Sequence, residues 1–265
     1  MISKVSAAAV RHRHVVLLLG LLVAGVNAAA VGFASALGQV LFTPLLLLAV
    51  VVLLLSVIAV GIRPACFVVL PQVPAFATPA PAWKVFFALG FLGPGSANVG
   101  AVVRSARAGM ASTFDVVMTI SWLALVALLL VEAWRGHDVQ LRPHGIQQRW
   151  VLGSLTVPWE AVPAAQVPAG ADRPSRLRMT FAEPLLVRRR GLPWGWNALR
   201  TDSVDARFLA AAIRHYVGHP EHRAVIGSQA EYRRLLADLA DRNGGSDESI
   251  TGPDCPPAPP AQRAF

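Results

Sequence analysis

Charge is missing from one long stretch of this sequence, and cysteine is scarce throughout. Residues 15–62 contain no charged side chain, although the chain of 265 residues carries 24 basic and 15 acidic groups. Only Cys66 and Cys255 occur, too few for the disulfide framework of a small secreted domain, so both thiols are expected to be free. The sequence also has no His-Glu-x-x-His motif, no phosphate-binding loop and no paired carboxylates placed for acid/base work. We therefore expect no enzyme, no catalytic residue and no cofactor.

Hydrophobic and charged residues are divided between two regions of the chain. Overall, 54% of the residues are hydrophobic, yet the part from Arg135 onward holds 17 of the 24 basic groups and 13 of the 15 acidic ones. This division predicts a membrane region followed by a polar region. The net charge is +9, but no basic stripe alternates with aromatic residues, so nucleic-acid binding is not expected.

A basic N-terminal tail, residues 1–14, precedes the membrane region, residues 15–134, in which four segments are candidate spans. They are residues 15–37, 41–62, 85–103 and 116–134. The first has 23 residues, which as a helix reach ~35 Å, enough to cross a bilayer. Only Gly38-Gln39 separates the first two segments, which predicts a helical hairpin. The first apolar run continues past the signal-peptide-like cleavage site near Ala30, so an uncleaved helix is expected.

The third segment determines the orientation, because Gly93-Pro94-Gly95-Ser96 interrupts it. Four spans with the N-terminus inside place eight near-membrane basic residues inside and two outside, whereas three spans give seven and three. The positive-inside rule thus favours four spans in the cell membrane, with both termini cytoplasmic. The five prolines of residues 64–83 exclude a regular helix there, and we expect this loop to lie along the membrane interface.

Residues 135–218 alternate as strands do. Short alternating runs cover residues 139–142, 146–152, 154–159 and 177–181, with a further strand expected near 185–188. A helix then carries the apolar stripe Val204, Phe208, Ala212 and Tyr216, capped by Asp202 or Ser203. The expected core of this region comprises Trp150, Trp159, Leu177, Met179, Phe181 and Phe208. A second amphipathic helix is expected in residues 219–242, with Val225, Tyr232, Leu236 and Leu239 on one side, and a disordered tail in residues 243–265.

Short motifs in the polar region carry a resemblance. They are Leu141-Arg142-Pro143-His144-Gly145-Ile146, then Arg149 and Trp150, then the segment Val157-Pro158-Trp159-Glu160-Ala161-Val162. This series of motifs, together with the closing helix up to Tyr216, resembles the pleckstrin-homology-like (PH-like) domain of bacterial membrane proteins. The resemblance covers about residues 136–218. It implies an α+β antiparallel barrel with a closing C-terminal helix, placed after an α-helical transmembrane region of about four helices.

Two groups of side chains are candidates for binding. Arg188-Arg189-Arg190, with Arg142 and Arg149, could face anionic lipid headgroups, although a solvated face is the more common role of such charge runs. His215 and His219 lie four residues apart, as metal ligands on one helix do, with Glu221 and His222 beyond them. Because Gly218 and Pro220 interrupt that helix, we expect the imidazoles to separate and no metal site to form.

The sequence therefore predicts a bacterial multi-pass membrane protein without enzymatic activity. Its expected partners are the lipid bilayer and other membrane proteins, and its expected work is scaffolding or interaction through a membrane-tethered PH-like domain. The alternative is an accessory subunit of a transporter or channel, for which the interruption at Gly93 is the main indication. Absence of charge inside the first two spans argues against transport.

Overall fold

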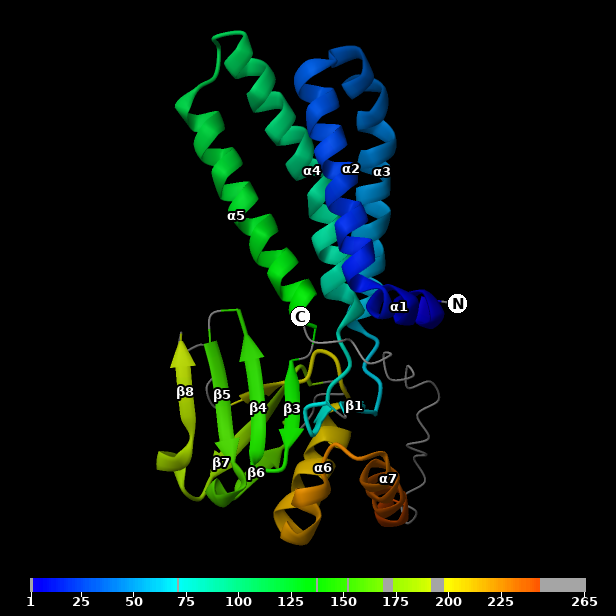
Figure 1. Cartoon of the computed structure of the whole chain (residues 1–265), viewed down its shortest axis with the longest axis vertical. Coiled ribbons are helices and arrows are strands. Elements are labelled where there is room, and N and C mark those ends of the chain that lie inside the picture. The colour runs from blue at the N-terminus through cyan, green and yellow to red at the C-terminus, as the bar shows by residue number, and fades with distance from the viewer. Residues whose placement is uncertain are drawn as a thin grey trace. The chain divides into compact units, whose positions relative to one another are not determined.

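Two compact units make up the chain, and the second unit is discontinuous in sequence. The computed structural model describes residues 2–70, 72–136, 138–151, 153–168, 174–191 and 198–243. Unit 1 comprises residues 1–62 and 81–136, and unit 2 comprises residues 63–80 and 137–265 (Figure 1). The expected disordered tail from residue 244 onward lies outside the described residues.

Unit 1 is helical. Its elements are α1 (Ile2–Arg11), α2 (Arg13–Phe33), α3 (Ser35–Val60), α4 (Ala82–Arg107) and α5 (Thr113–Arg135). Four of these helices, α2 to α5, are long and apolar enough to cross a membrane. The expected four apolar helices are thus present, but α2 ends and α3 begins around Ala34 rather than at Gly38-Gln39.

Helix α4 packs against α2, α3 and α5, and it runs unbroken through Pro94. Glycines allow these close approaches. A Cβ atom on Gly100 would lie 2.6 Å from the carbonyl oxygen of Ala28 in α2, and one on Gly90 would lie 2.6 Å from Leu53 in α3. Small residues bring membrane helices together in this way, because lipid offers no hydrophobic drive for helix association. The expected interruption at Gly93 is therefore a packing feature of one continuous helix.

Unit 2 contains two antiparallel sheets. The first has the strand order β1-β2-β3-β4-β5-β8, and the second has the order β6-β7-β9. Figure 1 shows β3, β4, β5 and β8 of the first sheet side by side in this order. The strands of the first sheet are β1 (Val68–Leu70), β2 (Ala75–Ala77), β3 (Val139–Arg142), β4 (Gly145–Trp150), β5 (Gly153–Pro158) and β8 (Arg188–Gly191). Those of the second are β6 (Pro163–Gln166), β7 (Arg176–Phe181) and β9 (Ala198–Arg200). Within the described residues, the two sheets do not join into one closed barrel.

The proline-rich segment between α3 and α4, expected to be a loop, instead contributes two strands to the first sheet. Strand β2 pairs with β3, with Phe76 opposite Leu141. Phe76 is fully buried and stacks with Phe67. Thr78 bonds Val139 twice, through its N–H (2.9 Å) and its hydroxyl (3.2 Å). The apolar alternation in β1 and β2 is too short to be recognised in the sequence, and it is packing against the rest of unit 2 that stabilises these strands.

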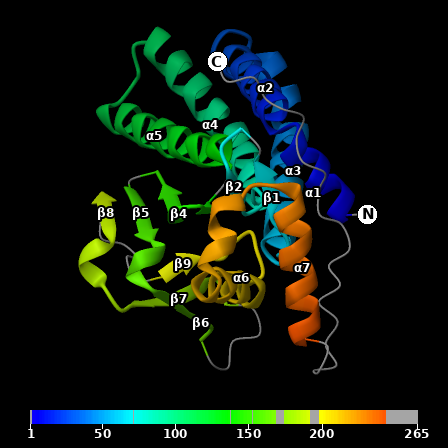
Figure 2. The same ribbon diagram turned by 60° about the horizontal axis from the view of Figure 1, so that its bottom comes forward.

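Two helices follow the sheets. Helix α6 (Ala206–Gly218) packs on β6 and β7, and α7 (Gln229–Asn243) lies beside it after the 3-10 turn η3 (Pro220–Val225) (Figure 2). The cap of α6 is Asp205, whose side chain accepts the N–H of Phe208 at 2.9 Å, rather than Asp202 or Ser203. The expected helix in residues 219–242 is divided into η3 and α7, and Val225, expected on its apolar side, is exposed at the end of η3. On α7, Tyr232 and Leu239 are buried as expected, but Leu235 is buried in place of Leu236.

The core of unit 2 matches the expected set in large part. Trp159, Leu177, Met179 and Phe208 are buried, and Trp150 and Phe181 are half-buried against them. The expected strand near 185–188 is instead the 3-10 turn η2 (Pro184–Leu186) followed by β8, and the expected end of β4 at Leu152 lies outside the described residues.

Cys66 is disulfide-bonded, so the expectation of a free thiol there is wrong. Cys255 lies outside the described residues.

Candidate functional site

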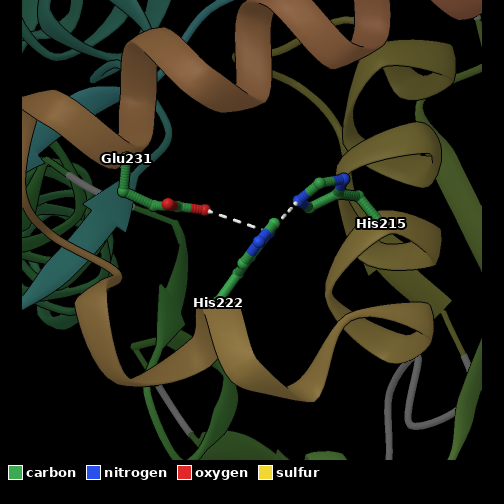
Figure 3. A group of neighbouring side chains, drawn as sticks. All are labelled: His215, His222 and Glu231. Atoms are coloured by element: carbon green, nitrogen blue, oxygen red, sulfur yellow. Dashed lines mark hydrogen bonds and ion pairs between the residues drawn. The ribbon is translucent and has the colours of Figure 1, made fainter.

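Three side chains from the C-terminal part of unit 2 converge. His215 belongs to the last turn of α6, His222 to η3, and Glu231 to the first turn of α7 (Figure 3). We call these three residues the His-Glu cluster. The Nε2 atom of His215 lies 3.2 Å from Nδ1 of His222, which lies 3.9 Å from Oε1 of Glu231. One ligand atom from each residue can be chosen so that all lie within 4.8 Å of one another.

Local sequence explains why the chain turns back on itself at the cluster. Pro220 occupies the start of η3, where its missing N–H costs no helical hydrogen bond. Gly227 has a φ of +96°, and a Cβ atom there would lie 2.5 Å from the backbone nitrogen of Ala75, so this turn requires glycine. The hydroxyl of Ser228 then accepts the N–H of Glu231 at 3.2 Å, which fixes the first turn of α7.

The interruption at Gly218 and Pro220 does not separate the imidazoles. Helix α6 continues through Gly218, and the N–H of His219 still reaches the carbonyl of His215 at 2.9 Å. The ring of His219 stacks on that of His215 at 4.7 Å between centroids, and that of His222 lies 5.3 Å from His215. The expected loss of geometry is therefore not observed, because the turn folds η3 back against α6 instead of carrying it away.

Neighbouring groups hold the cluster in place. The hydroxyl of Tyr216 donates to Oε1 of Glu231 at 3.3 Å, and Arg234 lies 3.3 Å from Oε2. Burial raises the pKa of Tyr216, and the charge of Glu231 raises it further, so the phenol remains a proton donor to the carboxylate. On the other side, Oδ2 of Asp238 lies 3.7 Å from Nδ1 of His215. Two imidazole nitrogens and a carboxylate are a donor set that transition metals accept.

Strand register divides the five arginines that the sequence singles out. Directly paired residues in antiparallel strands share a face, as do residues two apart on one strand. Arg149 in β4 pairs with Ser154 in β5, and Ser154 pairs with Arg190 in β8, so these three residues share a face. Two residues further along each strand, Gln147 pairs with Thr156 and Thr156 pairs with Arg188, so Arg188 lies on that face as well. Gln140 in β3 pairs with Gln147, and Arg142 lies two residues after Gln140, so Arg142 is on the same face as Arg149.

Four arginines thus share one face of the first sheet, which we call the arginine face: Arg142, Arg149, Arg188 and Arg190. Arg189 pairs with Leu155 and lies on the opposite face. Burial lowers the pKa of Arg142, and the positive charge of Arg149 lowers it further, which indicates that these two guanidinium groups are neighbours. Arg142 also donates two hydrogen bonds to Oε1 of Gln140, at 2.7 and 3.1 Å. Within the described strands the other residues on this face are uncharged. One carboxylate lies at its edge, because Asp138 precedes β3, falls opposite Arg149 in the same register, and accepts the N–H of Arg149 through its backbone carbonyl at 3.1 Å.

Polar side chains inside unit 1 pair with one another. Asn27 in α2 donates to the hydroxyl of Ser96 at 2.8 Å, and Ser96 donates to the carbonyl of Gly93 at 2.7 Å. Lys84 in the first turn of α4 forms a 3.0 Å ion pair with Glu132 near the end of α5. These contacts satisfy polar groups among packed helices, as the bilayer requires. The Lys84–Glu132 pair joins residues 48 apart in sequence, so the sequence alone does not predict it.

Comparison of the chain with protein-family models, curated proteins and solved structures found no match.

Proposed function

We propose that this chain is a four-span membrane protein whose unit 2 is a PH-like interaction domain, tethered at the cytoplasmic surface, and that its arginine face binds anionic lipid headgroups. Three chain connections, after Ile62, after Ala80 and after Gly136, join unit 2 to the helices. A domain tethered in this way is held within reach of the bilayer surface, so even weak binding acts at a high effective concentration.

Strand pairing supports an even number of crossings between the two segments of unit 2. Strand β2 follows α3, and its partner β3 follows α5. Hydrogen-bonded strands lie on the same side of a membrane, so α4 and α5 together must cross it twice or not at all. Both helices are long and apolar enough to cross. This is the observation that favours four spans over three, and it agrees with the positive-inside count.

The order of elements supports the PH-like assignment. A meander of β3, β4 and β5 carries the motif residues, a second sheet follows it, and α6 packs against that second sheet. Trp159, from the motif after β5, is buried and donates its indole N–H to the carbonyl of Arg142 at 2.9 Å. This hydrogen bond connects the end of β3 to the turn after β5, so the motif residues hold the first and last strands of the meander together.

The single observation that supports lipid binding is the shared register of the arginine face. Each arginine near an anionic bilayer contributes on the order of 1 kcal/mol. Four of them on one face give an attraction that depends on charge rather than on a shaped pocket. Such binding is expected to be weak, to show little headgroup specificity and to fade as salt shortens the Debye length from ~10 Å at 0.1 M to ~3 Å at 1 M.

Quenching by spin-labelled lipids tests this proposal on the full chain. A fluorescent amino acid replaces His144, which is exposed in the turn between β3 and β4. The chain is reconstituted in phosphatidylcholine nanodiscs that contain either spin-labelled phosphatidylserine or spin-labelled phosphatidylcholine. We expect stronger quenching by phosphatidylserine at low salt and equal quenching by both lipids at high salt.

Two variants of equal net charge make the test specific. The first replaces the arginine face with glutamine at all four positions, and the control replaces four exposed arginines elsewhere: Arg176, Arg178, Arg214 and Arg233. Preference for phosphatidylserine should disappear in the first variant and persist in the second. A preference that survives in the first variant, or that is absent from the wild-type chain at low salt, would contradict lipid binding by this face.

A further inference from the structure

We infer that the His-Glu cluster is a binding site for a divalent transition-metal ion, with zinc as the best match, bound by His215, His222 and Glu231. This inference concerns a site outside the arginine face and does not depend on lipid binding. It reverses the expectation from the sequence, whose premise was that the turn at Gly218 and Pro220 separates the imidazoles.

Distances within the cluster fit a tetrahedral ion. Zinc-to-nitrogen bonds of about 2.0–2.1 Å place two ligand atoms ~3.3 Å apart at the tetrahedral angle. Nε2 of His215 and Nδ1 of His222 lie 3.2 Å apart. Oε1 of Glu231 lies 3.9 Å from the same Nδ1, a second edge that is ~0.6 Å longer than the tetrahedral spacing. Figure 3 shows Glu231 and His215 approaching His222 from opposite sides.

Surrounding groups match what metal-bound histidines and carboxylates usually have. A histidine ligand commonly directs its second nitrogen toward a carboxylate, which orients the ring and strengthens the ligand. Asp238 supplies that carboxylate, since its Oδ2 lies 3.7 Å from Nδ1 of His215. Tyr216 and Arg234 both contact Glu231, and each restricts the carboxylate to one orientation.

Burial indicates how the ion would be held. His215 is fully buried and Glu231 is 1% exposed, whereas the side chain of His222 is 20% exposed. Three protein ligands leave one position of a four-coordinate ion, which water can fill from the side of His222. Two buried ligands and one solvent-accessible ligand give the ion an entry path without exposing the whole site.

A hydrogen bond between two neutral imidazoles is the competing explanation of the 3.2 Å contact. It needs one protonated and one unprotonated nitrogen, and it requires neither Glu231 nor an ion. Metal binding instead joins three elements, α6, η3 and α7, through one centre. An ion that binds only the folded chain stabilises it in proportion to RT ln(1 + [ion]/Kd), so melting should shift with zinc concentration.

The full chain, purified in detergent without a polyhistidine tag and stripped with a chelator, provides the test. Zinc is added back, and bound metal is counted by elemental mass spectrometry after desalting, with thermal unfolding measured in parallel. Cobalt is used as a second probe, because tetrahedral cobalt with nitrogen and oxygen ligands has a visible absorption band. We expect one zinc ion per chain, a rise in Tm and a tetrahedral cobalt spectrum.

Substitutions assign the ligands. His222→Ala is the main variant, because its side chain is partly exposed and its loss leaves the buried core filled. It should lose bound zinc, the cobalt band and the rise in Tm. Glu231→Gln should do the same. Asp238→Asn should keep one zinc ion per chain but bind it about 10–100-fold more weakly, as expected for a group that orients a ligand.

His219→Ala is the matched control, since its ring stacks in the same group while its Nδ1 lies 2.9 Å from the carbonyl of His215. It should bind zinc as the wild type does. Absence of stoichiometric zinc in the wild type would overturn the proposal and leave the imidazole hydrogen bond as the explanation. Retention of zinc by His222→Ala, or its loss from His219→Ala, would equally overturn the ligand set given above.

Discussion

The backbone N–H of Phe67 donates a hydrogen bond to the hydroxyl of Tyr232 across 3.1 Å, although 165 residues separate the two in sequence. This bond joins the segment that follows α3 to the last helix of the chain. The rings of Phe67, Phe76, Phe208 and Tyr232 pack together around it. The segment between α3 and α4 is therefore part of the core of unit 2.

Truncation of Phe76 should destabilise unit 2 strongly. Phe76 is fully buried, and removing a buried phenylalanine side chain costs about 3–5 kcal/mol through lost contacts and a cavity. The measurement is thermal unfolding of full-length Phe76→Ala in detergent, followed by tryptophan fluorescence. Val73→Ala is the control, because Val73 is 45% exposed between β1 and β2 and should leave Tm almost unchanged. Equal Tm values for both variants would show that β2 is not in the core.

A fragment covering residues 136–242 alone should fail to fold cooperatively. It lacks β1 and β2, so β3 loses its neighbour and the ring cluster loses Phe67 and Phe76. Fusing residues 63–80 to this fragment through a flexible linker should restore a cooperative melting transition. Circular dichroism and thermal melting of the two fragments compare them directly. A sharp transition in the shorter fragment would mean that the hairpin is dispensable.

Phe208 and Phe181 should differ in their contributions to stability. Phe208 in α6 is 3% exposed and contacts Phe67 at 4.8 Å between ring centroids, whereas Phe181 at the end of β7 is only half-buried. Phe208→Ala should cost about 3–5 kcal/mol, and Phe181→Ala clearly less. Melting of the two full-length variants under the same conditions checks the order. A larger loss for Phe181→Ala would contradict the packing of α6 described above.

Removal of one partner of the Lys84–Glu132 pair should destabilise the helices more than removal of both. The side chain of Lys84 is 5% exposed and that of Glu132 22%. An unpaired charge among packed helices costs on the order of 2 kcal/mol here, less than the ~3–5 kcal/mol of a fully buried pair. In thermal unfolding, Lys84→Met should have a lower Tm than the double variant Lys84→Met/Glu132→Leu. The reverse order would indicate that the pair contributes no coupling.

Four spans place both outer turns of the bundle on one side of the membrane. Cysteines introduced at Ala36 and Met110, which flank these turns, should react with an impermeant reagent from outside the cell. Cysteines at Val73 and His144 should react only after the membrane is opened, with the unmodified chain as background. Reaction of Met110 and His144 from the same side would contradict a double crossing by α4 and α5.

Cys66 offers an independent test of the proposed cytoplasmic side. Disulfides persist in oxidising compartments and are reduced in the cytosol. If unit 2 is cytoplasmic, rapid alkylation of freshly lysed cells should label Cys66 as a thiol, and its disulfide should form only after extraction. A disulfide already present at lysis would place unit 2 on the opposite side.

The strands β3, β4, β5 and β7 and helix α6 could be predicted from the sequence, because each carries a periodic apolar pattern of its own. Helices α2 to α5 could be predicted from their long apolar runs, whereas α1 lies in residues 1–14, for which only a basic tail was expected. Strands β1, β2, β6 and β9 have three or four residues each and little alternation. Their pairing is decided by partners far along the chain, as with Phe76 opposite Leu141. The local pattern does not contain that information, so the sequence predicts only a loop in residues 64–83.

The candidate sites were predictable to different degrees for the same reason. Arg142, Arg149, Arg188 and Arg190 could be singled out by charge, but only the pairing of β5 with β8 shows that they share a face and that Arg189 does not. The sequence draws attention to the histidines His215, His219 and His222, but helix-breaking residues usually separate their neighbours, so it predicts no metal site there. Glu231 joins the histidines from α7, and the spacing of nine residues from His222 carries no recognisable metal motif. The stacking of three imidazoles depends on a reversal of chain direction that sequence spacing does not report.

The split of unit 2 into two chain segments also constrains how the protein is made. Strands β1 and β2 leave the ribosome about 60 residues before β3, their partner, so at ~5–20 residues per second they wait several seconds for it. During that interval α4 and α5, both long and apolar enough to cross a membrane, are synthesised, and the hydrogen-bonding edge of β2 stays open to other strands. Unit 2 can therefore complete its first sheet only after both helices have been made, and a translation pause between β2 and β3 would prolong the period in which the nascent chain can aggregate.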